Sequence, residues 1–369
     1  MDIAFVSGNP HLPQVIGGVE VNTHELAGEL IRRGNRVWVV AKLSLRNGFG
    51  LWRAARTGVL RRNFSVDREL GYPVFRSRRP WQLTNEVPRP AVAVVQNGAM
   101  LDYAAAFARV GVPSVAYLHG LGFEGWDKAG PSVSLPFRGY IANSRFTAER
   151  FRHRYGLDTV VIPPLFRRER YVTQPGGPMV TFINPVPVKG TELALEIAEL
   201  CPDIPFCFVR AWPLGVREAA RLQRRLRRLG NIQLRDRTAD MRSVYRDTRI
   251  LLVPSQWEDE TWGRVASEAQ FSGIPVVASN RGGLPEAVGP GGIILGYDQP
   301  ATVWADALRE LWSDARRYSE LSEAALRHAS RPDLRPNRQV DLLVETLERL
   351  TASVPYCPDA SNWCDLDEG

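Results

Sequence analysis

Short apolar runs alternate with amphipathic segments from one end of this chain to the other. Residues 3–7 and 36–41 are apolar runs of strand length, and residues 21–33 between them carry leucines at helical spacing. Gly34 stands where that helix would end. Two parallel strands need a crossover between them, and a helix usually supplies it. The alternation therefore predicts an α/β fold of parallel sheets with helices on both faces.

The alternation is interrupted once and then starts again. Pro163-Pro164 and the proline- and glycine-rich residues 174–178 mark the interruption. The expected strands are 91–95, 114–118, 139–143, 179–184, 205–210, 232–234, 250–253 and 276–278. The expected helices are 191–200, 216–229, 262–272, 301–311 and 316–330. Because 369 residues exceed one ordinary core, we predict doubly wound domains at 1–164 and 165–337. A helix at 338–350 is expected to pack back on the first domain, before a polar acidic tail at 351–369.

The composition excludes several classes of protein. No apolar run reaches the ~18 residues of a membrane span, and no zinc-finger or aromatic RNA-binding pattern occurs, so nucleic acid is not an expected partner. The formal charge of +7 suits anionic lipid or phosphorylated substrates. The start Met-Asp-Ile-Ala-Phe-Val-Ser lacks a basic segment, and the four cysteines form no CxxC pair. We therefore expect a cytoplasmic protein with reduced thiols, peripheral to the inner membrane face.

Gly17-Gly18-Val19-Glu20 opens the first expected helix, directly after the first strand and its loop. Glycines let the backbone approach an anion closely, and a helix N-terminus offers unpaired N–H groups to it. The pattern is not the GxGxxG dinucleotide fingerprint, and no acidic residue clearly ends the second strand. This disfavours a nicotinamide dehydrogenase and leaves two interpretations, a phosphate-binding turn or a plain turn.

Residues 254–286 hold the richest set of polar groups. Glu260 and Glu268 would face one side of a site if Glu260 ends a loop and Glu268 lies two turns into the following helix. Carboxylates in this place accept hydrogen bonds from the hydroxyls of a ribose or hexose. A glycine-rich turn at 281–283 follows a further strand, at the sheet edge where ligands bind in open α/β sheets. The alternative is an acidic, solvated helix start.

Residues 254–288 closely resemble the donor-binding segment of retaining glycosyltransferase family 4, whose members have the GT-B fold. The family pattern PS…E-x-x-G-x-x-x-x-E-A, then G-x-P-V-V-A-S…G-G-x-P-E, matches nearly throughout. The opening GGVEVNTHELAGELIRRGNRVWVV, Ala142-Asn143-Ser144 and Lys189-Gly190 resemble other segments of the family, in the same order. The resemblance covers residues 2–350 and implies two Rossmann-like domains facing across a cleft.

The resemblance implies roles for the matching positions. His119 would lie near the reacting sugar, Lys189 would neutralise the departing diphosphate, and Glu260 would contact the donor sugar; these three are the implied catalytic residues. Glu268 would hold the donor ribose. The remaining donor-binding positions are Gly17, Gly18, Asn184, Arg210, Thr261, Trp262, Gly263 and Arg264, and the acceptor-binding positions are Glu20 and Asn22. The family usually has an arginine at position 184, so either Arg264 or Arg210 compensates for Asn184, or the donor is bound differently.

The function implied is a hexosyl-type retaining transferase that moves a sugar from a nucleoside-diphosphate sugar, with UDP or GDP, to an acceptor hydroxyl in polysaccharide or glycoconjugate biosynthesis. No cofactor and no metal are expected, because lysine and helix N-termini replace Mg²⁺ on the diphosphate; the letters DxD occur at 365–367, in the acidic tail. Two alternatives stay open. One is a sugar-nucleotide epimerase of the same fold, and the other is a non-catalytic nucleotide-sugar binder.

The acceptor is expected on the first domain, around residues 15–22, 43–80 and 121–136. It would be a glycan, a lipid-linked molecule or a small molecule. The 43–80 stretch is rich in arginine and carries scattered aromatic residues. It has three interpretations: contact with anionic lipid, a grip on an acidic glycan, or a solvated loop.

Overall fold

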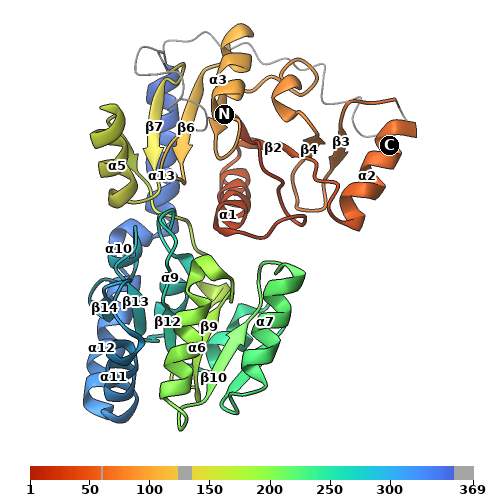
Figure 1. The fold of residues 1–369 in the computed structure, drawn as a ribbon. Helices are drawn as coiled ribbons and strands as arrows, with labels where there is room; N and C mark the ends of the chain where they lie inside the picture. Colours follow the sequence, from red (N-terminus) through yellow and green to blue (C-terminus); the bar gives the residue numbers. More distant parts are fainter. Residues whose placement is uncertain (60, 124–134, 353–369) are drawn as a thin grey trace. The chain divides into compact units, whose positions relative to one another are not determined.

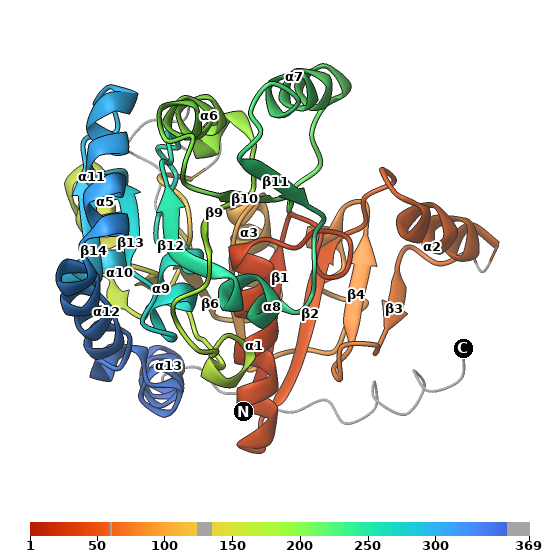
Figure 2. The same ribbon diagram turned by 90° about the horizontal axis from the view of Figure 1, so that it is seen from below.

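The computed structural model describes residues 1–59, 61–123 and 135–352. The chain forms two compact units, one of Met1–Leu165 with the segment that begins at Pro336, and one of Phe166–Arg335. Each unit is built on its own sheet, with helices packed on the sheet faces (Figures 1 and 2). The predicted acidic tail, from residue 353 on, and residues 124–134 of the expected acceptor region lie outside the described residues.

The N-terminal unit has a sheet of eight strands in the order β3-β4-β2-β1-β5-β6-β7-β8. Neighbouring strands run parallel except β3, which pairs antiparallel with β4. The strands are β1 (Asp2–Ser7), β2 (Arg36–Lys42), β3 (Ser65–Asp67), β4 (Val74–Ser77), β5 (Val92–Val95), β6 (Ser114–Leu118), β7 (Gly139–Ala142) and β8 (Val160–Val161). The helices are α1 (Gly18–Arg32), α2 (Gly48–Val59), α3 (Met100–Arg109), α5 (Arg145–Tyr155) and α13 (Pro336–Thr351).

The C-terminal unit has a sheet of six strands in the order β11-β10-β9-β12-β13-β14, with every pair parallel. The strands are β9 (Met179–Ile183), β10 (Phe206–Val209), β11 (Ile232–Arg235), β12 (Thr248–Val253), β13 (Val276–Ser279) and β14 (Gly292–Leu295). The helices are α6 (Thr191–Leu200), α7 (Val216–Leu226), α8 (Met241–Arg246), α9 (Arg264–Gln270), α10 (Leu284–Val288), α11 (Ala301–Ser313) and α12 (Ala315–Ala329). Renumbered within the sheet, the order is 3-2-1-4-5-6, which is that of a Rossmann fold.

The strands are apolar on both sides because both faces of each sheet are covered. In β1, Ile3 and Phe5 belong to one buried cluster, and Ala4 and Val6 belong to another. Helices α1 and α13 supply leucines to the first cluster, and α3 supplies aromatic residues to the second. Successive side chains of the strand point to opposite faces of the sheet, so alternate residues enter the two buried clusters.

Helix α13 follows the second unit in the sequence and completes the first unit. Its Leu343 and Leu347 are fully buried in the same cluster as Leu26 and Leu30 of α1. The Gln339 amide nitrogen donates to the carbonyls of Pro163 and Pro164, at 2.8 and 3.1 Å. The chain end is therefore part of the core of the N-terminal unit.

The structure differs from the sequence analysis in two places. Of the three interpretations of residues 43–80, it excludes the solvated loop, since the stretch forms α2, β3 and β4. The Trp262 indole is buried, and its Nε1 donates to the Ser267 hydroxyl at 3.1 Å. Helix α9 begins at Arg264, not at 262, because Gly263 has φ +80°, a left-handed backbone conformation that cannot continue a right-handed helix. Glu268 consequently lies about one turn into the helix, not two. Within the described ranges, no helix combines the length and the apolar character that a membrane crossing requires.

We predict that Leu347→Ala destabilises the N-terminal unit by about 2–5 kcal/mol, because it leaves a cavity between α13 and α1. Amide hydrogen exchange in β1 should accelerate, while exchange in β9 of the other unit stays as in the wild type. Glu345→Ala, at an exposed position of the same helix, is the matched control. Unchanged exchange in β1 would show that α13 is not part of that core.

Candidate functional site

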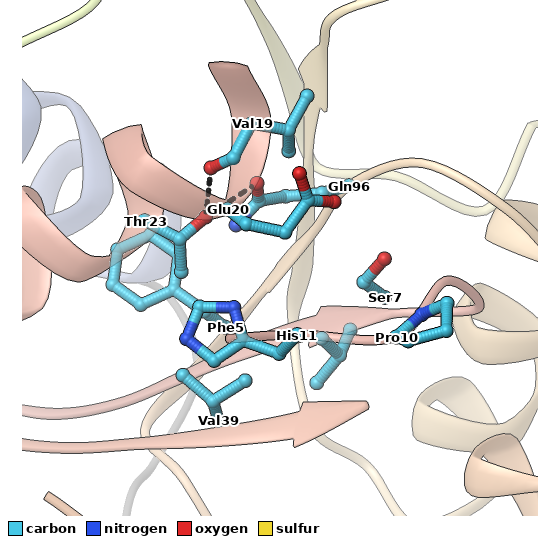
Figure 3. Close-up of a pocket in the computed structure, with 10 residues that line it drawn as sticks. Phe5, Ser7, Pro10, His11, Val19, Glu20, Thr23, Val39 and Gln96 are labelled. Carbon is cyan, nitrogen blue, oxygen red and sulfur yellow. Dashed lines mark hydrogen bonds between the residues drawn. The ribbon is translucent and has the colours of Figure 1, made fainter. Parts of the chain in front are cut away.

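A pocket lies at the carboxyl edge of the N-terminal sheet, where β1 meets β5. The chain leaves β1 toward β2 on one side and β5 lies on the other, so the loops after the two strands diverge at this point. Ligands bind at such switch points in open α/β sheets. Figure 3 shows the side chains that gather there from β1, the following loop, α1 and the end of β5. The lining residues are Phe5, Val6, Ser7, Pro10, His11, Val19, Glu20, Thr23, Val39 and Gln96.

Glu20 is the acidic group of this pocket. Its side chain lies in the first turn of α1 and is buried, and burial raises its pKa to about 7 against the opposing effect of backbone hydrogen bonds from Glu20 and Gly17. A Cβ at Gly17 would lie 2.6 Å from the Glu20 Oε2. The carboxyl group therefore already occupies the helix N-terminus, where the sequence suggests a phosphate, and Gly17 leaves room for it. Gly18, the first residue of α1, is exposed.

A hydrogen-bonded cluster that the sequence pattern does not reveal lies beside the pocket. The Tyr72 hydroxyl is 3.0 Å from His11 Nε2 and 3.0 Å from His24 Nδ1. The fully buried Arg76 donates to Asp67 at 2.7 Å and to the Leu12 carbonyl at 2.5 Å. Burial, then Arg76 and then His24 lower the pKa of His11 to about 3. His11 is therefore a neutral hydrogen-bonding group at pH 7.

Two other predicted residues of this unit are buried and packed. Asn22 is 1% exposed, and its Oδ1 accepts a hydrogen bond from the Leu165 N–H at 2.7 Å, so it fastens the end of the unit to α1. His119 follows β6, and its ring lies 4.3 Å from the ring of Tyr117. The acceptor role implied for Asn22 would fall to its buried amide nitrogen, because its Oδ1 is engaged by the Leu165 backbone.

The second group of site residues lies at the switch point of the C-terminal sheet, between β9 and β12. Lys189 follows β9 and Glu260 follows β12. The Lys189 Nζ lies 2.5 Å from Glu260 Oε2, and the Ser255 hydroxyl donates to the same oxygen at 2.9 Å. The two charged side chains are 15% and 8% exposed, so the ion pair is largely withdrawn from water.

Glycines bring the backbone segments of this site into contact. Gly190 has φ +84°, and a Cβ there would lie 1.9 Å from the Pro254 carbonyl oxygen, so the turn after β9 meets the loop after β12 directly. The Gly283 N–H donates to the Glu260 carbonyl at 2.8 Å, and a Cβ on Gly283 would lie 2.1 Å from the Thr261 oxygen. The glycine-rich turn after β13 thus holds the Glu260 loop in place.

Glu268 has buried partners. The Tyr245 hydroxyl of α8 donates to its Oε2 at 2.8 Å, and Arg264 Nε lies 3.4 Å from its Oε1. The Arg264 guanidinium also packs 4.2 Å from the centre of the Phe166 ring and donates to the Tyr171 hydroxyl. Arg264 is therefore an organising residue between α9 and the segment that opens the unit.

The remaining predicted residues of this unit play different parts. Thr261 precedes α9, and its N–H donates to the Asp259 carbonyl at 2.8 Å. This N–H is therefore not one of the unpaired N–H groups at the N-terminus of the helix. Gly263 is the residue before α9 and has φ +80°. Arg210 pairs with Asp236 at the surface. Asn184 is buried, and its side chain binds the backbone of Trp212. Arg210 and Arg264 thus both have carboxylate partners, as Lys189 has Glu260. The compensation for Asn184 by either arginine stays a prediction.

Glu20→Gln removes a carboxyl group with a pKa of about 7 in the folded protein and an ordinary value of 4.5. The folded state holds this proton more tightly, so the wild type loses stability as the pH rises from 4.5 to 7. The shift corresponds to about 3 kcal/mol. We expect chemical unfolding of the N-terminal unit to show Glu20→Gln gaining on the wild type between pH 4.5 and 8. Glu345→Gln should show no such gain, and a gain for Glu20→Gln that is the same at both pH values would contradict the burial argument.

Two family models match consecutive parts of the chain. Glycosyltransferase Family 4 matches residues 16–170, and Glycosyl transferases group 1 matches residues 178–314. Lys189, Glu260 and Glu268 all lie in the second match. The sequence-based recognition of family 4 is thereby confirmed.

Curated relatives match over a shorter part. D-inositol 3-phosphate glycosyltransferase of Corynebacterium kroppenstedtii is 46% identical over 94 residues, which is 25% of this chain and 20% of the relative. The protein of the same name from Thermobispora bispora is 38% identical over 115 residues, 30% of this chain and 26% of the relative. The matched segments thus span about a fifth to a quarter of the length of these relatives.

Solved structures match over nearly the whole chain. A glycosyltransferase from Rickettsia africae has a TM-score of 0.74 at 16% identity and covers 95% of this chain and 99% of its own. Anabaena HepE in complex with UDP-glucose has a TM-score of 0.73 at 20% identity, with 95% and 100% covered. These likenesses confirm the predicted GT-B fold class of two Rossmann-like domains. With a family 4 domain followed by a group 1 domain, the chain belongs to the GT-B glycosyltransferases of family 4.

Proposed function

We propose that this protein transfers a hexose from a nucleoside-diphosphate sugar to an acceptor hydroxyl, with retention of configuration and without a divalent metal. The Lys189–Glu260 pair carries the proposal. It sets one cation and one carboxylate side by side at the switch point of a Rossmann sheet, within the group 1 domain. A diphosphate needs the cation, and sugar hydroxyls need the carboxylate.

In the proposed transfer step, two side chains, Lys189 and Glu260, act on the donor. The bond between the sugar C1 and the phosphate oxygen breaks, and its electron pair leaves with the nucleoside diphosphate. The acceptor oxygen forms the new bond to C1 on the same face, and its proton passes to the departing phosphate oxygen. Lys189 would stabilise the negative charge on the diphosphate, while Glu260 would orient the sugar. Because a cation of the protein does this work, we propose that no metal ion and no other cofactor is required.

We also propose roles in donor and acceptor binding for other residues predicted from the sequence. Glu268 would accept hydrogen bonds from the ribose, and His119 would act beside the reacting sugar. Glu20 would contact the acceptor, which we expect to be a glycan, a lipid-linked molecule or a small molecule. The UDP-glucose bound by HepE supports a nucleotide-sugar donor, and the name of the curated relatives supports transfer chemistry.

Two other functions compete with this one. A sugar-nucleotide epimerase would change the donor without any acceptor, and a non-catalytic binder would hold the donor without turnover. The replacement of the expected arginine by Asn184 is the observation that favours a binder. Incubation with a nucleotide sugar and a panel of glycan, lipid-linked and small-molecule acceptors separates the three. An epimerase makes a new sugar nucleotide without any acceptor, a binder makes nothing, and a transferase makes a glycoside and the nucleoside diphosphate.

We predict that one nucleoside diphosphate among UDP, GDP, dTDP and ADP raises the melting temperature, equally with and without Mg²⁺. A ligand at 100 times its dissociation constant adds about 2.7 kcal/mol to the unfolding free energy. Glu268→Gln should weaken the affinity about 10-fold or more, because a hydrogen bond to a charged group is lost. Glu310→Gln, at an exposed position of α11, is the matched control. A response that requires Mg²⁺, or none to any diphosphate, would contradict the proposal.

We also propose peripheral contact with anionic lipid through the outer face of α2. Leu51 and Trp52 are each 56% exposed and Val59 is 83% exposed, which is unusual for large apolar side chains. Leu51 and Val59 lie eight residues apart and so share a helix face. Exposed Arg56 lies 5.7 Å from the ring of Trp52. An apolar face with basic neighbours is the pattern of a helix that lies on a membrane surface.

The α2 contact predicts that the wild type sediments with vesicles rich in phosphatidylglycerol and stays in solution with phosphatidylcholine alone. Leu51→Asp with Trp52→Asp should weaken this binding about 10-fold or more, since apolar burial and charge both change. Val216→Asp replaces an 88% exposed apolar residue of α7 and should have no effect. Equal binding by both variants, or no binding by the wild type, would rule out the contact.

A further inference from the structure

Two tryptophans form a corner around the Lys189 ammonium. Its Nζ lies 4.4 Å from the ring centre of Trp257 and 5.5 Å from that of Trp212. The two indoles meet edge to face, with centroids 5.8 Å apart and planes at 86°. Trp257 comes from the loop after β12 and Trp212 from the loop after β10, so the two indoles bring the loops at the ends of these strands into contact. Both rings keep part of their surface exposed.

Asn184 determines where Trp212 lies. It directly follows β9, and its Oδ1 accepts a hydrogen bond from the Trp212 backbone N–H at 2.9 Å. Its own N–H donates to the Val209 carbonyl at the end of β10, at 2.7 Å. Asn184 is also at φ +69°, a backbone conformation that asparagine tolerates better than most residues. The residue thus ties the end of β9 to the loop after β10 at two points.

The ammonium of a lysine in this position has to be held in place by the residues around it. Its ammonium is a point charge on a flexible stem, without the fixed fork of a guanidinium. It pairs with Glu260, and a bound diphosphate would compete with this carboxylate for the ammonium. Aromatic faces attract a cation from any direction above the ring and do not compete for its hydrogen bonds. They would therefore keep the ammonium in place during the exchange of partners.

We propose that Asn184 and Trp212, together with Trp257, are positioning residues that hold Lys189 for the diphosphate. This inference rests on the proposed function, because it takes the diphosphate as the ligand of Lys189. Position 184 then acts through the indole of Trp212 and supplies no cation itself. In this site, Asn184 in place of the family's arginine serves to position Trp212, and Lys189 supplies the cation.

One variant distinguishes this proposal from the alternative that the site merely lacks a cation. Asn184→Arg would restore a cation, and a site that merely lacks one would bind the diphosphate more tightly. In our account it binds more weakly, because arginine cannot give the Trp212 N–H its acceptor and fits φ +69° poorly. We expect Asn184→Ala and Trp212→Leu each to weaken binding about 3- to 10-fold, the range of a partly desolvated cation–π contact. Trp212→Phe should stay within about 2-fold, since it keeps an aromatic face.

The test titrates UDP, GDP, dTDP and ADP in turn into the full chain by calorimetry, with melting temperatures measured on the ligand-free variants. The double variant Asn184→Ala/Trp212→Leu should bind no more weakly than Trp212→Leu, because both changes remove one contact. In a Lys189→Met background, Trp212→Leu should have no further effect. Trp312→Leu removes a comparable tryptophan, 5.3 Å from Arg249 in the same unit, and serves as the control with unchanged affinity.

The possible failures are distinct. If the wild type binds none of the four diphosphates, the proposed function is overturned and this inference is overturned with it. If the wild type binds but Asn184→Arg binds more tightly, or if Trp212→Leu weakens binding equally with and without Lys189, the positioning role is overturned while the transferase proposal stands. Loss of affinity that merely follows a lower melting temperature of the ligand-free variant would also overturn it.

Discussion

In both units the strands run parallel, except the edge strand β3, so the carboxyl ends of the parallel strands meet at one edge of each sheet. Loops that leave this edge in opposite directions open a gap at the switch point, and the polar side chains of this chain converge there. In the C-terminal unit the result is the Lys189–Glu260 pair, and in the N-terminal unit it is the pocket around Glu20. Charges that are partly withdrawn from water interact strongly with a ligand, and they need partners within the protein. Glu260 is that partner for Lys189, and backbone N–H groups serve Glu20.

Elements with a strong apolar pattern could be predicted from the sequence closely. The strand at 114–118 and the helix at 191–200 have the predicted bounds, because their ends coincide with prolines, glycines and polar residues. Helix α5 was not predicted, since Phe151 is its one large buried apolar side chain in a surface rich in arginine. Its cap, the Ser144 hydroxyl that accepts from the Thr147 N–H, was the signal available. Helix α2 was missed because its apolar residues face outward.

The candidate site was predictable only in part. The resemblance to family 4 implied roles for Lys189 and Glu260, but their direct ion pair depends on how the turn after β9 approaches the loop after β12. Trp212 had no signal, because its place depends on a hydrogen bond to Asn184, 28 residues earlier in the chain. The Trp262 indole packs into the core, and no local pattern in the sequence indicated that contact. Such contacts join distant segments and leave no local pattern.

The most direct test of the account is a structure of the protein with its nucleoside diphosphate bound. We predict that phosphate oxygens lie within hydrogen-bond distance of Lys189 Nζ, that Lys189 has moved from Glu260, and that a ribose hydroxyl donates to Glu268. The indoles of Trp212 and Trp257 should still flank the ammonium. A nucleotide bound away from the switch point of the C-terminal sheet, with the Lys189–Glu260 pair intact, would contradict the central claim.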